Sequence, residues 1–147
     1  MPDSGEIDKA LIARLSGDAT LAGLLPDGVH WSEAPQGKTK FAIVSMVITL
    51  DRSQMAAPGQ RRAAEDVLYL VKAVTLGASR TLAGQAAARI DALLEDQPLT
   101  ITGYTCAAMA REERIDDTEI DDVDASIRWQ HRGGRYRVVA IPEGSAS

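Results

Sequence analysis

The order in which helical and extended segments follow one another is the feature that most constrains the fold of this chain. A helix-like opening leads into two apolar, β-rich runs, and one amphipathic helix follows them. The chain then closes with a strand pair and a last β-rich stretch. Helices and strands that are grouped in this way, without regular alternation, are typical of a small α+β domain.

Three segments have the spacing of helices. Apolar residues recur every four positions from Ile7 to Leu15 and give this first helix one apolar face. Asp18 is placed to cap a second, short helical turn from Ala19 to Leu25. The third helix, Leu82 to Leu94, has an apolar stripe and several alanines, which would let it lie close to a sheet.

Two apolar runs, Phe41 to Leu50 and Glu65 to Leu76, predict the central strands of the sheet. The segment between them, Asp51 to Arg62, has no periodicity and contains a Pro-Gly pair, so we expect a long, mobile loop or hairpin tip. Two further strands are predicted from Leu99 to Thr102 and from Tyr104 to Arg111.

The last third of the chain is more ambiguous. Residues Glu112 to Asp124 hold eight acidic side chains against one arginine, and we interpret them as solvated charge on a loop or rim. They lack the central Gly and terminal Glu of a calcium-binding EF-hand loop. Gly133-Gly134 then indicates either the turn of a closing hairpin or one long strand with a glycine bulge. Pro142 to Ser147 is expected to be a frayed tail.

Length and composition favour one domain over residues 1–147, because a chain of 147 residues buries a core without metal or disulfide staples. The longest apolar run is too short to span a bilayer, and no basic segment followed by an apolar one opens the chain. Cys106 is the only cysteine. We expect it to be a buried structural thiol in a protein of a reducing cytoplasm.

No pattern of residues indicates catalysis, a metal or a cofactor. His30 and His131 lie far apart in sequence, with no cluster of zinc ligands around them, and are expected to be ordinary half-buried or rim histidines. There is no G-x-S-x-G motif, and Gly77-Ala78-Ser79 lacks the further glycines and the lysine of a nucleotide site. A net charge of −5 disfavours tight binding of nucleic acid but suits a surface that DNA slides past.

Two charged segments are candidates for contacts with neighbouring molecules. Arginines bracket the predicted loop, and acids crowd the later segment, so the acidic segment of one copy can face the basic loop of the next, head to tail. Solvated charge is the competing interpretation for both. The candidate interface residues are Arg52, Met55, Arg61, Arg62, Glu112, Glu113, Asp116, Asp117, Glu119, Asp121 and Asp122.

Four segments spread over residues 7–141 also share a pattern with a known family. They read A-L-I-A-R-L-S-G-D-A-T-L-A-G-L-L, E-D-V-L-Y-L-V-K-A-V, A-A-A-R-I-D-A-L-L-E-D-Q-P-L and R-W-Q-H-R-G-G-R-Y-R-V-V-A. In this order they resemble the tail-terminator, or tail-completion, proteins of long-tailed bacteriophages, similar to minor tail protein U.

The resemblance implies a fold and a structural role. The fold would be a mixed, mainly antiparallel sheet with an N-terminal helix and one long helix packed on it. The protein would form a homohexameric ring at the head-proximal end of the tail tube. There it would end polymerisation of the major tail tube protein, at the length set by the tape-measure protein, and join the tail to the head-completion (stopper) protein. It would assemble in the bacterial cytoplasm and stay in the neck of the virion, with DNA only in transit through the lumen and no contact with a membrane.

Three other functions remain open at the level of sequence. The first is another neck component, such as a head-tail adaptor or head-closure protein. A small-ligand-binding or regulatory α+β module is the second, and an enzyme is the least favoured. The oligomeric state separates them, because a ring of six supports a neck protein, whereas a monomer or dimer favours the ligand-binding module.

Overall fold

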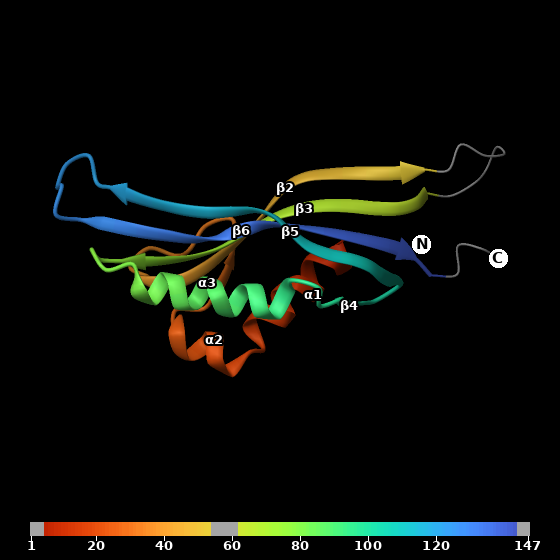
Figure 1. The fold of residues 1–147 in the computed structure, drawn as a ribbon, viewed down its shortest axis with the longest axis horizontal. Helices are drawn as coiled ribbons and strands as arrows, with labels where there is room; N and C mark the ends of the chain where they lie inside the picture. The colour runs from red at the N-terminus through yellow and green to blue at the C-terminus, as the bar shows by residue number, and fades with distance from the viewer. Residues whose placement is uncertain (1–4, 54–61, 144–147) are drawn as a thin grey trace.

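The computed structural model describes the backbone of residues 5–53 and 62–143, and the side chains of residues 5–49 and 64–143. Within these ranges the chain is an α+β fold, as the sequence predicts: three helices lie against one face of an elongated, twisted sheet (Figure 1). The elements are α1 (Gly5–Ser16), α2 (Ala19–Leu24), β1 (Val29–Trp31), β2 (Lys40–Ser53), β3 (Arg62–Leu76), α3 (Thr81–Leu94), β4 (Thr100–Ile101), β5 (Tyr104–Ile120) and β6 (Arg128–Pro142).

Among the described residues the sheet has six strands, in the order β1-β2-β3-β6-β5-β4. Of the strand pairs in this described part, only β1–β2 is parallel, so the sheet is mixed and mainly antiparallel, as expected. The four central strands have 14 to 17 residues, whereas strands of globular proteins average about 5–6. At about 3.3 Å per residue, such strands are roughly 50 Å long. The short β1 and β4 therefore line only a fraction of each edge.

The hydrophobic core lies between the sheet and the helices. Ile7, Leu11 and Leu15 on α1 are fully buried, which confirms the four-residue spacing. On α3 the buried face includes Ala83 and Ala86, whose small side chains allow the close approach to the sheet that the sequence predicts. The strands contribute every second residue to this face, because strand side chains alternate between the two sides of a sheet. Examples are Val67, Tyr69, Val71 and Ala73 on β3, and Tyr136, Val138 and Ala140 on β6.

Asp18 caps α2 as predicted. Its backbone is extended, and its carboxylate accepts a hydrogen bond from the Leu21 amide at 2.8 Å. The same carboxylate accepts two hydrogen bonds from Arg89 on α3, at 2.6 and 2.8 Å. This pair fixes the short helix α2 to the long helix α3.

The acidic segment lies on an exposed rim, the outer edge of the sheet, but the expectation of a loop is wrong for most of its length. Glu112 to Ile120 belong to strand β5, which pairs with β6 through the whole run. Only the connection from Asp121 to Ile127 is a turn. The physical reason is charge pairing across strands, because β6 places Arg137, Arg135, Arg132 and His131 opposite the acids, and opposite charges on neighbouring strands stabilise a sheet.

Gly133-Gly134 forms no turn. Both glycines lie inside the single long strand β6, neither has a positive φ, and the register with β3 is unbroken. Of the two predicted alternatives, the hairpin turn is wrong and the long strand is confirmed, but β6 lacks the expected glycine bulge. The register shifts occur in the partner strand β5, between Cys106 and Ala108 and between Arg111 and Glu113.

Two boundary predictions and one burial prediction also need correction. Asp51 to Ser53 and Arg62 are paired strand residues, so the predicted loop is shorter than Asp51 to Arg62, and its remainder lies outside the described residues. In the expected frayed tail, Pro142 ends β6 and the Glu143 amide donates to the Gly103 carbonyl at 2.9 Å. Cys106 is half-buried rather than buried, because β4 covers β5 only as far as Thr105.

Candidate assembly surfaces

Both long edges of the sheet are only partly paired. On one edge, β1 pairs with Ala42 to Val44 of β2, so the outer edge of β2 from Ser45 to Ser53 faces no described strand. On the other edge, β4 pairs with Tyr104 and Thr105 of β5. Unpaired edges of long strands are templates for strand addition by another chain. We call the first of these, Ser45–Ser53, the β2 edge.

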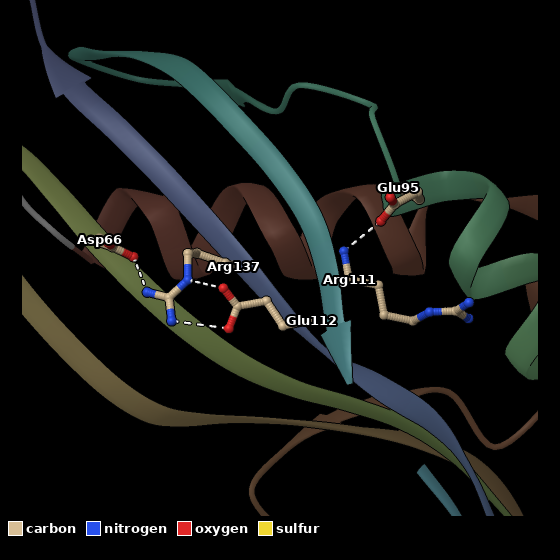
Figure 2. A network of polar contacts seen from close by, with 5 residues as sticks. All are labelled: Asp66, Glu95, Arg111, Glu112 and Arg137. Atoms are coloured by element: carbon tan, nitrogen blue, oxygen red, sulfur yellow. Dashed lines mark hydrogen bonds and ion pairs between the residues drawn. The ribbon is translucent and has the colours of Figure 1, made fainter. Parts of the chain in front are cut away.

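The connection after α3 covers β5 further than β4 does. The Asp96 amide donates to the Met109 carbonyl at 3.0 Å, and the Arg111 amide donates to the Glu95 carboxylate. Figure 2 shows this second bond, which joins the C-terminal end of α3 to β5. The part of β5 whose outer edge has no described partner therefore runs from Glu113 to Ile120, and we call it the β5 edge.

The β2 edge exposes three consecutive apolar side chains. Met46, Val47 and Ile48 are 43%, 40% and 48% exposed, and the register with β3 shifts between Met46 and Ile48. An exposed, hydrophobic strand edge tends to aggregate unless another chain covers it. This part of β2 therefore has the composition of a protein contact rather than of a solvated edge.

The sheet face opposite the helices holds a shallow depression of about 350 Å³. Its floor includes Phe41 and Trp129, whose ring centroids are 6.2 Å apart, together with Leu70. At its rim, His131 Nε2 lies 2.9 Å from a Glu119 carboxylate oxygen. Both histidines of the chain are half-buried, as the sequence predicts. Within the described ranges, no group of three or more His, Cys, Asp or Glu residues is arranged to hold a metal ion.

Three strands are tied together by a polar network on that same face (Figure 2). Arg137 of β6 donates to Asp66 of β3 and, through Nε and Nη2, to Glu112 of β5; the Nη2 bond is 3.0 Å long. The hydrogen bonds from Arg137 hold the pKa of the Glu112 carboxyl below its usual range and raise the pKa of Arg137. The Asp66 side chain is only 4% exposed, so its carboxylate needs polar partners, and this guanidinium supplies one of them.

Four of the seven acidic candidate residues contact basic side chains of their own chain, three of them arginines. Glu112 pairs with Arg137, and Glu113 with Arg135 at 3.5 Å. Asp116 pairs with Arg132, and Glu119 lies against His131.

The remaining three acids lie near the β5–β6 turn. Asp121 accepts hydrogen bonds from the amides of Val123 and Asp124, at 2.8 and 2.9 Å. Asp117 and Asp122 make no hydrogen bond or ion pair with any described residue. These two carboxylates keep their charge available to a partner.

The basic candidates lie at the other end of the sheet. Arg52 is in β2 and Arg62 in β3, paired with Ala64 and Ser53 respectively. Met55 and Arg61 lie outside the described residues. The open end of the β2–β3 pair and the β5–β6 turn point in opposite directions (Figure 1). The two predicted sets therefore do not meet within one chain.

Sequence reasoning missed a cluster of four arginines between α3 and the β5–β6 pair. Arg80, Arg111, Arg114 and Arg132 line one groove. Part of the cluster could have been found in the sequence. When the segments R-E-E-R and H-R-G-G-R are paired as antiparallel strands, Arg114 lies beside Gly134 and Arg132 lies beside Asp116. Strand pairing does not predict the position of Arg80, because this residue lies at the start of α3 and reaches the groove only through the packing of that helix on the sheet.

Comparisons with known proteins identify the family. A family model described as "Tail completion protein gp17" matches residues 9–139. A solved chain from the "Virion of native gene transfer agent (GTA) particle" is 20% identical, with a TM-score of 0.63 over 92% of this chain and 96% of that chain. A second solved chain is 16% identical, with a TM-score of 0.58 over 92% of this chain and 95% of the other. These two share the fold. A search among curated protein sequences finds no match.

No helix in the described residues is long and apolar enough to cross a membrane. The family match covers most of the chain and agrees with the resemblance seen in its sequence. This chain belongs to the tail completion protein gp17 family, and it is a structural protein of a phage-type tail.

Proposed function

We propose that this protein is a tail terminator. Six copies form a ring at the head-proximal end of the tail tube, end polymerisation of the major tail tube protein, and present a surface to the head-completion protein. The tape-measure protein sets the length at which the ring binds. The observation that supports this most directly is the unlike character of two surfaces on one subunit, the exposed apolar β2 edge and the oppositely charged ends of the sheet.

Unlike surfaces favour a head-to-tail contact. The β2 edge exposes apolar side chains and the two ends of the sheet differ in charge, whereas the β5 edge takes no part in this contact. A contact between two different surfaces leaves the growing assembly with one free surface of each kind, so addition continues until the rotation closes a ring. Covering Met46, Val47 and Ile48 would stabilise such a contact through burial of their exposed apolar surface.

Charge supports the same arrangement. The basic end, with Arg52 of β2 and Arg62 of β3, and the acidic end, with Asp117 and Asp122, lie at opposite ends of the sheet. In a head-to-tail ring the acidic end of one copy reaches the basic end of the next. The acidic balance of the chain, −5, also suits a ring through which DNA passes without binding.

The proposal is tested with purified tail tube protein from the same particle. Tube subunits are polymerised with and without this protein, and tube lengths and ends are measured by electron microscopy. We expect shorter tubes with a ring on one end. The double variant Arg61→Glu with Arg62→Glu should lose ring or tail joining while its monomer stays folded, and Arg128→Glu, an exposed arginine outside this end, is the matched control. Tubes that grow to the same length with bare ends would contradict the terminator function.

A further inference from the structure

The four-arginine cluster lines a groove that the tail-terminator function does not use. The groove has a volume of about 540 Å³ and lies between α3 and the overhanging strand β5. The α3 wall is built from Gly84, Ala87 and Ala88, whose small side chains leave the space open. The opposite wall holds Arg111 and Arg114 of β5.

The groove has more positive charge than its own residues neutralise. Arg132 is only 8% exposed and pairs with Asp116, and Arg111 lies 3.4 Å from Asp91. Burial lowers the pKa of Arg132, and the nearby charges of Arg80 and Arg114 lower it further.

Two arginines of the groove are exposed and unpaired. The side chains of Arg80 and Arg114 make no hydrogen bond or ion pair with any described residue. The groove is therefore a local region of excess positive charge on a chain whose net charge is −5.

The shape beside the groove suits an extended chain. The β5 edge, Glu113 to Ile120, begins where the contacts of Glu95 and Asp96 end, and β5 itself forms one wall of the groove. A peptide that adds to this edge as a strand directs every second side chain to the helix side of the sheet, where Arg80 and Arg114 lie.

We propose that the β5 edge and the groove beneath it bind an extended, acidic segment of a partner polypeptide. The partner adds as a strand to Glu113–Ile120, and its alternate carboxylates pair with Arg80 and Arg114. Carboxylates match these groups because guanidinium binds carboxylate through paired, charge-assisted hydrogen bonds. A continuous phosphate backbone fits less well, because it carries a charge at every nucleotide and cannot avoid Asp91 and Asp116 in the same groove, whereas a peptide can place uncharged side chains beside them.

The first experiment uses a fluorescein-labelled decapeptide of alternating Glu and Thr, measured by fluorescence anisotropy at low ionic strength. We expect saturable binding of this peptide and none of the matched Lys-Thr decapeptide. The double variant Arg80→Ala with Arg114→Ala should weaken binding by about tenfold or more, because two charge-assisted contacts are lost. Arg128→Ala, an exposed arginine of β6 outside the groove, is the control and should change affinity by less than about twofold. Both variants alter exposed, unpaired side chains, so their folding is expected to be intact.

A second readout locates the peptide. Hydrogen exchange of the amides of 113–120 should slow when the peptide is bound, and amides of the β2 edge should not change. Equal binding by the double variant and by Arg128→Ala, or protection elsewhere, overturns the proposal. Stronger competition by double-stranded DNA than by unlabelled peptide overturns it in favour of phosphate.

The other candidate occupant of the groove is a second copy of this chain. If 113–120 become protected as the protein alone is concentrated, and Asp121→Asn with Asp122→Asn abolishes that protection, the groove serves the ring and a separate partner is excluded. The decapeptide experiment does not depend on ring formation, so its failure leaves the terminator proposal standing.

Discussion

A Cβ atom on Gly133 would lie 2.1 Å from the carbonyl oxygen of Val71 in the neighbouring strand β3. On the other side of β6, a Cβ on Gly134 would lie 2.7 Å from the carbonyl oxygen of Glu113 in β5. Both contacts are with backbone, which has no rotamer to move out of the way. The glycine pair thus allows β3, β6 and β5 to approach closely at the centre of the sheet.

Gly133→Ala is therefore predicted to destabilise the protein by about 3 kcal/mol, because the methyl group forces β6 and β3 apart. Gly23→Ala in α2 is the matched control: nothing lies within 4 Å of its Cβ, and alanine favours a helix by up to about 1 kcal/mol over glycine. Urea unfolding of both variants measures the difference. Equal stabilities would show that the strands relax at no cost.

Arg137→Met should destabilise the protein by about 3–5 kcal/mol, since it leaves the buried Asp66 carboxylate without its guanidinium. Adding Asp66→Asn to this variant should restore much of the loss by removing the buried charge. The exposed Arg128→Met is expected to change stability by less than about 0.5 kcal/mol. Chemical denaturation of the four proteins tests the argument, which fails if the second substitution gives no recovery.

Asp18 predicts a pH dependence of stability. The hydrogen bonds from Arg89, with that from the Leu21 amide, lower the pKa of its carboxyl from 3.8 to about 2. A lowered pKa in the folded state means that the contribution is complete above the unfolded pKa and is lost as the pH falls towards 2.

Asp18→Asn should therefore be less stable than the natural protein at pH 7, and the gap should close between about pH 4 and pH 2. Asparagine still accepts the capping hydrogen bond, so the change isolates the charge. The exposed Asp117→Asn is the control and should show no such closing gap. A difference that stays constant down to pH 2 would contradict the assignment.

Met46→Lys together with Ile48→Lys tests whether the β2 edge is a contact. Both side chains are more than two-fifths exposed, so the monomer should keep its fold, while charge on the edge should block strand addition. We expect loss of oligomers in size-exclusion chromatography with an unchanged circular dichroism spectrum. Leu76→Lys, at an equally exposed apolar position on β3, is the matched control. Oligomers that persist in the double variant would exclude this edge.

Local periodicity predicted the elements that depend on local sequence. The four-residue spacing from Ile7 to Leu15 and the apolar stripe of α3 placed two helices correctly. The acidic strand was missed because its stability comes from Arg132, Arg135 and Arg137, which follow it in sequence and face it only after the hairpin forms.

The remaining misses have the same physical origin. In sequence, Gly133 has the character of a turn residue. Its actual role, which is to leave room for the carbonyl of Val71, depends on the pairing of β6 with β3. The arginine groove joins Arg80, at the start of a helix, to Arg114 on a strand, and only the packing of α3 under the sheet brings them together. The sequence showed that most of the predicted interface residues are charged, but it did not show that several of the acidic ones pair with basic side chains of the same chain.

The most direct test of the central claim is the absolute mass of the purified protein by light scattering, alone and then mixed with its tail tube protein. We expect a particle of six times the 15.7 kDa chain mass, or a smaller species that forms a ring of six only on tube ends. A stable monomer that ignores tube ends would contradict it.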